Sequence, residues 1–386
     1  MKWKISNEVN ILNKIEEITG EDIISPKNRI LILNSLKQEC RKTKPQDMKS
    51  TWIQFKNQIH DIKTGEVFEA SPNYFVTNPI PYKTHNGIYE LTPKMDRIFE
   101  EWVGKEYVKT LYEIIAYALL PNYPLNRLFC FIGSGMNGKS CFMNLLQKFL
   151  GKENCCSTEL DTLLTSRFEV TRLHKKLICI MGETNFNEMN KTSMLKKLTG
   201  GDLIGFEYKN KPHFHDFNYA KILIATNSLP TTSDKTLGFY RRWLIIDFPN
   251  QFSEQKDILA EIPEEEYEAL ALKCVSILHD LLIKRRFHNE GSVEDRMSKF
   301  EAKADFLQKF LDDFVVFECD GHITKADFRK KFADWCIENR HRQMAENTLS
   351  KKLKEKSIES GRKYADWLYD GKGGQLNVYL GVKWKD

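Results

Sequence analysis

The sequence has no long apolar run and no cysteine pattern of a disulfide framework or a zinc site. Its most apolar stretches, such as LYEIIAYALL, stop well short of the roughly 18 residues that a membrane-spanning helix needs. Nine cysteines are scattered from Cys40 to Cys336 without a CxxC pair, which is typical of a reduced, cytoplasmic protein. The first residues, MKWKISNEVN, lack the apolar core of a signal peptide. We therefore expect no membrane contact and a location in the cytoplasm.

The composition is that of a folded protein with more than one domain. At about 150 residues per domain, 386 residues predict two or three domains. Hydrophobic residues at 41% and charged residues at 29% exclude a disordered chain. The net charge is only +5, but residues 321–386 hold 15 basic and 9 acidic residues. The basic surplus therefore lies at the C-terminal end.

Changes in hydrophobic spacing divide the chain into four regions. Residues 1–125 combine helical spacing with a short alternating β pattern, and residues 126–250 alternate short apolar runs with helices, as in an α/β parallel sheet. Residues 251–305 predict a helical lid followed by an exposed charged stretch. Residues 306–386 predict three helices and then a hairpin.

A glycine-rich loop follows the first apolar run of the second region. The run LFCFI is followed by GSGMNGKS and then by CFMNLLQKFLG, which is the complete G-x-x-x-x-G-K-[ST] pattern between a strand and a helix. Backbone N–H groups of such a loop and the helix N-terminus surround phosphate. Lys139 can reach the β- and γ-phosphates, and the Ser140 hydroxyl can bind Mg²⁺. We therefore expect ATP and Mg²⁺ as cofactors, with the nucleotide bound by Gly133, Ser134, Gly135, Met136, Asn137, Gly138, Lys139 and Ser140.

Two further strands are expected to end beside this loop. The run KLICIMG precedes Glu183, and a carboxylate at the C-terminal end of a buried parallel strand can orient or deprotonate the water that attacks the γ-phosphate. The same carboxylate would serve the metal, unless Glu188 helps. The run KILIAT precedes Asn227, whose neutral amide can hydrogen-bond phosphate and water, although Asn before a turn is common.

Two adjacent arginines precede a third apolar run, WLIIDFP. Arg241 and Arg242 at the mouth of a buried strand are costly unless they meet anions. In a ring ATPase, such an arginine reaches the γ-phosphate of the neighbouring subunit and stabilises transition-state charge. The alternative is a solvated basic pair.

The order of these motifs resembles that of the superfamily 3 helicases. GSGMNGKS, LICIMGETN, LKKLTGGD, ILIATNSLP and RRWLIIDFP follow one another, and they look most like the phage, plasmid and poxvirus-type primase-helicases. The resemblance covers about residues 50–250 well and the C-terminal region loosely. It implies an AAA+ module that assembles into a hexameric ring and translocates on DNA.

The same resemblance implies roles for single residues. Lys139 and Ser140 would hold phosphate and metal, Glu183 would be the catalytic carboxylate that also serves the metal, and Asn227 would be sensor 1. Arg242 matches the arginine finger best, because it directly precedes the apolar strand, with Arg241 assisting in trans.

Two regions have a pattern suited to DNA. The strands LIGFEY and HFHDFNY can pair around a tip with Lys209, Lys211 and His213, which suits phosphate contact in a ring's central channel, where the family has a DNA-gripping hairpin. The alternative is an exposed basic turn. The last region predicts a winged-helix-like module with Lys351 and neighbouring lysines on its second amphipathic helix. The alternative there is a small packing or primase-docking domain.

Taken together, the motifs predict an ATP-driven, Mg²⁺-dependent replicative DNA helicase. Its expected partners are single-stranded and forked DNA, further copies of itself in a homo-hexamer, and a primase or polymerase module, fused or separate. Polarity of 3′→5′ is implied by the resemblance alone. One alternative is an origin-binding replication initiator that uses ATP without processive unwinding. Another is a small-molecule kinase, which would share GxxxxGKS but would need neither Asn227 nor an arginine acting in trans.

Overall fold

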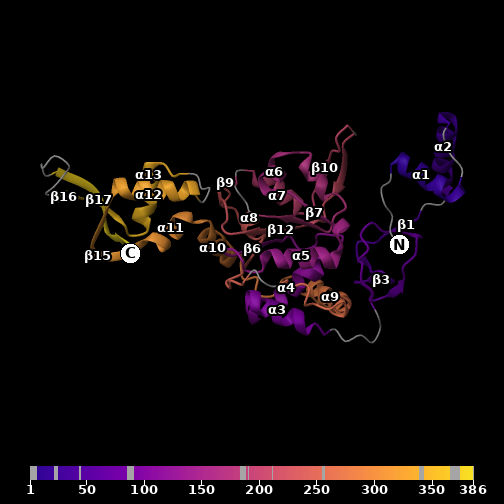
Figure 1. The fold of residues 1–386 in the computed structure, drawn as a ribbon, viewed down its shortest axis with the longest axis horizontal. Coiled ribbons are helices and arrows are strands. Elements are labelled where there is room, and N and C mark those ends of the chain that lie inside the picture. The colour runs from indigo at the N-terminus through magenta and orange to yellow at the C-terminus, as the bar shows by residue number, and fades with distance from the viewer. Residues whose placement is uncertain are drawn as a thin grey trace.

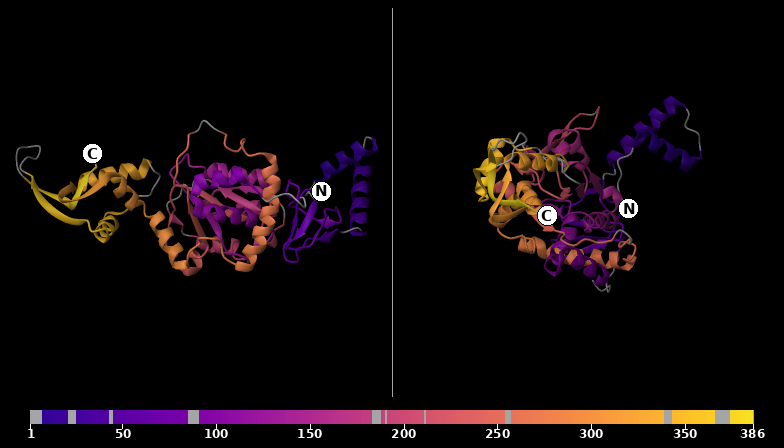
Figure 2. Two further views of the ribbon diagram at one scale, coloured as in Figure 1. Left: turned by 90° about the horizontal axis from the view of Figure 1, so that it is seen from below. Right: turned by 60° about the vertical axis from the view of Figure 1, so that its left-hand side comes forward.

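The chain forms three parts that lie in a row. Figure 1 shows a small N-terminal part, a central α/β core and a C-terminal domain, with the N-terminal and C-terminal parts at opposite ends of the core, as the left view of Figure 2 also shows. None of the described helices is long and apolar enough to cross a bilayer. The computed structural model describes residues 7–20, 25–42, 45–84, 91–182, 188–189, 191–210, 212–253, 257–338, 343–365 and 374–385.

The N-terminal part consists of two helices and short strands. Helices α1 (Glu8–Thr19) and α2 (Pro26–Lys42) pack through Leu12 and Leu33. A turn at Lys63–Gly65 joins β3 and β4, which are antiparallel neighbours, in line with the alternating β pattern expected for this region. The strands of this part are β1 (Gln46–Asp47), β2 (Trp52–Gln54), β3 (Gln58–Asp61), β4 (Val67–Glu69) and β5 (Tyr74–Phe75).

A five-stranded parallel sheet forms the centre of the core, in the order β14-β6-β12-β8-β7. Its three central strands are almost entirely buried, because helices cover both faces, and this is why they read as continuous apolar runs. The predicted α/β class with a parallel sheet is confirmed. The strands are β6 (Leu128–Ile132), β7 (Cys155–Ser157), β8 (Ile178–Met181), β12 (Lys221–Thr226) and β14 (Trp243–Asp247).

Alternate side chains of each strand enter two separate apolar clusters. Phe129 and Phe131 of β6 pack with α3, α4, α5 and α9, whereas Cys130 and Ile132 pack on the other face with α6, α7, α8 and α10. The helices are α3 (Pro93–Val103), α4 (Lys105–Ala118), α5 (Lys139–Leu150), α6 (Leu160–Thr165), α7 (Thr192–Leu198), α8 (Leu237–Tyr240), α9 (Glu264–Lys284) and α10 (Val293–Ala304), with short 3₁₀ turns at Lys152–Asn154 and Glu169–Leu173. Short strands β9 (Glu188–Met189) and β13 (Thr231–Thr232) pair beside them.

The C-terminal domain has its own apolar core and an antiparallel sheet in the order β15-β17-β16. The three predicted helices and the final hairpin are present. Strand β15 was missed, because most of its side chains are exposed and its pairing with β17 is interrupted between Phe317 and His322. The elements are α11 (Phe306–Phe314), β15 (Val315–Thr324), α12 (Lys325–Glu338), α13 (Glu346–Glu355), β16 (Glu359–Ala365) and β17 (Gly374–Trp384).

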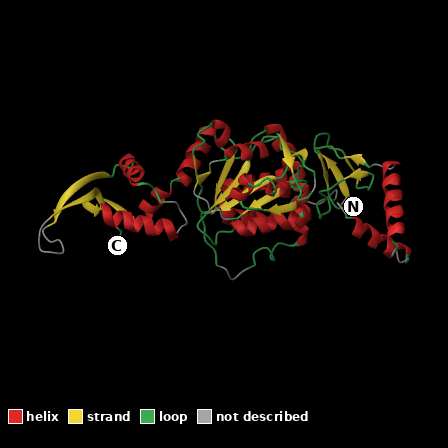
Figure 3. Cartoon of the chain, turned by 90° about the horizontal axis from the view of Figure 1, so that it is seen from above, coloured by secondary structure: helices red, strands yellow, loops and turns green. Residues whose placement is uncertain are grey.

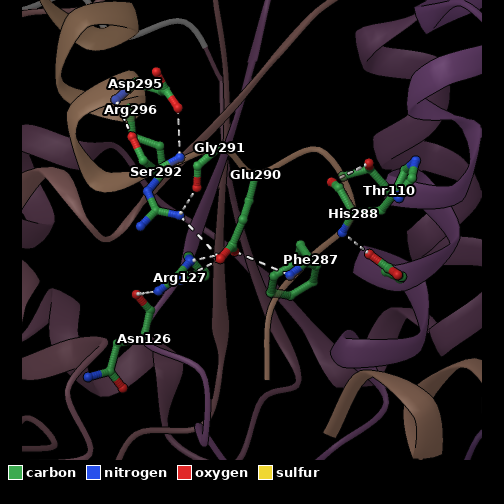
Figure 4. Close-up of polar contacts among 11 residues, drawn as sticks. Thr110, Asn126, Arg127, Phe287, His288, Glu290, Gly291, Ser292, Asp295 and Arg296 are labelled. Carbon is green, nitrogen blue, oxygen red and sulfur yellow. Dashed lines mark hydrogen bonds and ion pairs between the residues drawn. The ribbon is translucent and has the colours of Figure 1, made fainter. Parts of the chain in front are cut away.

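The charged stretch that was expected to be exposed contains a buried ionic cluster. Glu290 accepts hydrogen bonds from Nε and Nη2 of Arg127, both at 3.1 Å, and its carboxylate lies 3.3 Å from Nη1 of Arg296 (Figure 4). The side chains of Arg127, Glu290 and Arg296 are only 14%, 10% and 7% exposed. Burial is tolerated because the carboxylate is bidentate to one arginine and is shared with the other.

Helix α10 then leads from this cluster along the edge strand β14. It begins at Ser292, which forms a capping box with Asp295 (Figure 4). Arg296, Phe300 and Ala304 follow at intervals of four residues and are all buried. Most residues of this stretch are exposed, as expected, but one face of this charged segment packs against the core.

Replacing Glu290 with glutamine tests the ionic cluster. The amide keeps the shape but leaves two buried guanidinium groups without a counter-charge, and breaking such a pair costs about 3–5 kcal/mol. We expect Glu290→Gln to lower the free energy of unfolding by roughly 3 kcal/mol, measured by urea denaturation. Glu294→Gln is the matched control, because Glu294 is a nearby glutamate that is exposed in the first turn of α10. Equal stability of the two variants would contradict this reading of the cluster.

Candidate nucleotide site

The glycine-rich loop connects β6 to α5 at the carboxyl edge of the sheet. A Cβ atom on Gly133 would lie 1.8 Å from Nδ2 of Asn137, and one on Gly138 would lie 2.4 Å from the indole nitrogen of Trp102. Gly138 also has a φ of +89°, which disfavours any side chain. Close packing on both sides therefore requires glycine at these two positions of the loop.

The Lys139 side chain is directed into this loop. Its residue is 7% exposed, and Nζ donates to the backbone oxygen of Gly133 at 2.5 Å, to Oδ1 of Asn137 at 3.0 Å and to Oδ1 of Asn227 at 3.4 Å. Asn227 follows the last residue of β12, which is the parallel neighbour of β6. The structure thus brings together two side chains that the sequence places 88 residues apart.

The exposed side of the loop is the side that a ligand can reach. Ser134, Met136 and Ser140 are exposed, and Ser140 lies in the first turn of α5. Met136 has a φ of +47°, so a residue with a side chain sits in the left-handed region next to Gly135, which has a φ of +106°. A Cβ atom on Gly135 would have no described atom within 4 Å, so this side of the loop is open.

The segment after β14 forms hydrogen bonds with the glycine-rich loop, a role that sequence reasoning missed. Nδ2 of Asn137 donates to the backbone oxygen of Phe248 at 3.3 Å, and the backbone N–H of Phe252 donates to Met136 O at 2.7 Å. The signal that could have shown this is the parallel pattern itself. Strands β14 and β6 are neighbours, so their carboxyl ends lie at the same edge of the sheet.

Glu183, the expected catalytic carboxylate, lies outside the described residues. Gly182 directly follows β8, and β12 lies between β8 and β6 in the sheet. At about 4.8 Å per strand, the carboxyl end of β8 is roughly 10 Å across the edge from that of β6. The order along the edge is therefore the glycine-rich loop, Asn227 and then Gly182.

The two arginines before β14 have opposite environments. Arg242 is 7% exposed, and its guanidinium donates to Thr199 Oγ1 at 2.9 Å, to the backbone oxygen of Lys196 at 3.2 Å and to that of Gly238. Burial lowers the pKa of Arg242. Arg241 is exposed. Arg242 is thus bonded to neutral oxygens of its own chain, and Arg241 is the exposed arginine of the pair. This favours Arg241 over the expected Arg242 for contact with another molecule.

Both arginines lie at the edge of the sheet opposite the glycine-rich loop. Trp243, the first residue of β14, pairs with Leu128, the first residue of β6, and the loop begins after Ile132. Five strand residues at about 3.3 Å each separate the two edges by roughly 16 Å. The pair is therefore remote from the loop of its own chain.

The predicted basic hairpin is present, which confirms the strand pairing. Strand β10 (Leu203–Phe206) is antiparallel to β11 (Phe214–Phe217), and Lys209 and His213 near the tip are exposed. Lys211 lies outside the described residues. The side chains at the tip therefore come from a two-stranded ribbon that is separate from the central sheet.

A histidine that sequence reasoning missed contacts both strands of this hairpin. Nδ1 of His174 lies 3.1 Å from the Tyr208 hydroxyl, and Nε2 lies 3.1 Å from Oδ2 of Asp216. Its ring packs against Phe206 and Phe214, with centroids 5.1 and 4.9 Å away. Burial lowers the pKa of His174, although Asp216 opposes this shift. One ring thus joins both strands of the hairpin to the core.

Comparison with known proteins gives matches at low identity. A model of a family of unknown function, DUF5906, matches residues 131–242. Primase D5 of Fowlpox virus (strain NVSL) is 24% identical over 254 residues, which are 61% of this chain and 32% of that protein. A candidate helicase of Acanthamoeba polyphaga mimivirus is 22% identical over 364 residues, 82% of this chain and 35% of that protein. The chain is similar to viral primase-helicase proteins.

The chain spans about a third of the length of these curated relatives. Among solved structures, an apo structure of the NrS-1 C-terminal region aligns with 97% of this chain and 90% of its own, at 13% identity and a TM-score of 0.44. A second form of that region aligns with 84% of this chain and 82% of its own, at 14% identity and a TM-score of 0.40.

Alanine variants of Arg241 and Arg242 should differ in stability, because only Arg242 is buried. Arg242→Ala leaves buried oxygens without their donor, so we expect the free energy of unfolding to fall by about 2–3 kcal/mol. Arg241→Ala removes an exposed side chain and should change it by less than about 0.5 kcal/mol. Urea denaturation of both variants measures the difference. A stable Arg242→Ala protein would show that its guanidinium does not hold the turn together.

Proposed function

We propose that this chain is the motor of a DNA helicase of the superfamily 3, AAA+ type, and that it is the helicase part of a primase-helicase. The observation that carries the proposal is the Lys139 ammonium, held between the glycine-rich loop and Asn227 at the carboxyl edge of a parallel sheet. Ligands bind at this edge in open α/β sheets. Similarity to viral primase and helicase proteins supports DNA as the substrate.

The described residues fit a nucleoside triphosphate with Mg²⁺. The loop joins a buried ammonium to an exposed hydroxyl, that of Ser140, in the first turn of a helix. When bound, Mg²⁺ would neutralise charge on the phosphate oxygens. In our proposal Lys139 binds the β- and γ-phosphates and Ser140 holds the metal. Asn227 hydrogen-bonds the γ-phosphate and the attacking water, and Glu183 orients that water and accepts its proton.

Arg241 completes the site of a neighbouring subunit in the proposed hexameric ring. Its exposure and its distance of roughly 16 Å from the loop of its own chain support action in trans. Arg242 then has a different task, because its bonds to Thr199 and to the backbone hold the turn that presents Arg241. An arginine at the γ-phosphate stabilises charge that develops in the transition state.

The basic hairpin is our proposed contact with single-stranded DNA. Lys209, Lys211 and His213 would contact phosphates in the channel of the ring, and translocation would proceed 3′→5′ as in the family that the motifs resemble. The His174 bonds support this role, since a hairpin that pulls on DNA must be held to the core. A primase or polymerase module, fused or separate, is the expected protein partner.

The first functional prediction concerns Lys139. Lys139→Ala should lower DNA-stimulated ATP hydrolysis by at least about 100-fold, because it removes a cation placed for the phosphoryl group. Lys152→Ala is the control, since Lys152 is exposed beyond the other end of α5. Phosphate release and strand displacement from a forked duplex are the measurements. Hydrolysis without strand displacement by the natural protein would favour a replication initiator, and hydrolysis that single-stranded DNA does not stimulate would favour a kinase.

The second functional prediction tests the ring. Arg241→Ala and Glu183→Gln should each reduce hydrolysis by a factor on the order of 10³, because each active site lacks one group. Rings mixed from the two variants contain interfaces with an intact Glu183 and a natural Arg241, and these should recover part of the activity. Mixed rings, verified by native mass spectrometry, that stay inactive would contradict action in trans.

A further inference from the structure

One face of the C-terminal domain is polar, basic and exposed. Helix α13 buries Leu349 and Leu353, which hold it to the domain core. Its opposite face presents Asn347, Lys351 and Lys354, together with Thr348, and all four are exposed. On α13 itself, this face carries no aromatic or aliphatic side chain, although such residues anchor most protein interfaces.

The ribbon β16–β17 extends this face beyond the helices. Arg362 pairs with Asn377 and Tyr364 pairs with Gln375, and all four side chains are exposed. Asn377 and Gln375 lie two and four residues before Tyr379 on β17, so they share its side of the ribbon with their partners Arg362 and Tyr364. Tyr379 is buried against Phe328 of α12, so this is the side turned toward the helices. Figures 1 and 3 show the ribbon projecting past the helices at the end of the molecule.

Three acids of this domain form ion pairs within the chain. Glu346, at the start of α13, pairs with Arg329 of α12, Glu318 pairs with Lys383, and Asp305 pairs with Lys356. Glu355 lies at the far end of α13. In contrast, the described part of the chain provides no ion pair for Lys351, Lys354 or Arg362. The face therefore has positive charge available for an anionic partner.

We propose that this face binds duplex DNA, with α13 in the major groove and the ribbon along the adjacent backbone. A helix of ten residues is about 15 Å long, and with side chains about 10–12 Å wide, which fits a groove about 12 Å wide. Asn347 and the two lysines of α13 are side chains that hydrogen-bond base edges or phosphates there. Arg362 on the ribbon supplies a further phosphate contact.

This contact is separate from the proposed contact of the hairpin at Lys209. The hairpin belongs to the core and suits a single strand, whereas α13 and the ribbon match the shape of a double helix. Duplex binding requires neither nucleotide nor ring, so the inference does not rest on the proposed motor function. An acidic protein is the alternative partner for a basic face.

The test compares binding of two DNA forms by the full chain without nucleotide. Lys351→Ala/Lys354→Ala should weaken binding of a blunt duplex of about two helical turns by at least about 10-fold, and lower the slope of log affinity against log salt by up to about 2. Binding of an equally long single strand should stay unchanged. Lys63→Ala/Lys309→Ala is the matched control, because it removes the same charge from exposed lysines elsewhere. Fluorescence anisotropy over a series of salt concentrations measures all four cases.

Arg362→Ala provides a second variant outside α13, which should lower the salt slope for duplex by about 1. Equal duplex binding by the α13 variant and its control would overturn the proposal. A loss that is the same for duplex and single strand would also overturn it, because this would reflect charge alone. Binding of polyglutamate but not of duplex by the natural protein would assign the face to an acidic protein. Loss of ATP hydrolysis in any variant bears on the motor function and not on this contact.

Discussion

The parallel pairing of β6 with β12 is the constraint on which the candidate site depends. It places the end of β12 beside the glycine-rich loop, so that Asn227 reaches the Lys139 ammonium across one strand spacing. On its other side β6 pairs with β14, and this brings the backbone oxygen of Phe248 to Asn137. The loop is therefore supported by both neighbouring strands, and neither contact could form in a sheet with another strand order.

Much of the core could be predicted from the sequence, because buried parallel strands are short apolar runs with polar residues at their ends. Lys139, Ser140 and Asn227 were found in this way, since each follows such a run or its loop. The hairpin of β10 and β11 was also predictable, because turn residues separate two strand-forming segments. The sequence pattern was sufficient to predict an element where its defining contacts are between residues close in the sequence or recur along one strand.

Other features depend on which face of an element is covered, and local pattern does not show this. Arg241 and Arg242 are adjacent and chemically identical, yet only the second is turned toward Thr199 and the interior. Glu290 looks like part of a solvated segment until Arg127, 163 residues away, is placed beside it. His174 reaches Asp216 across 42 residues. In each case a tertiary partner decides whether a charged or polar side chain is buried.

The carboxyl end of the edge strand β14 contacts both helix α10 and the glycine-rich loop. Asp247 at its end accepts ion pairs from Lys303 at 2.7 Å and Lys299 at 3.0 Å, and these two lysines, which overcome the effect of burial, lower the pKa of Asp247. The next residue, Phe248, supports the glycine-rich loop. Helix α10, which carries both lysines, leads directly into the C-terminal domain. The ion pairs that hold α10 and the contact that supports the loop therefore come from adjacent residues at one strand end, so the same two residues connect the core to both.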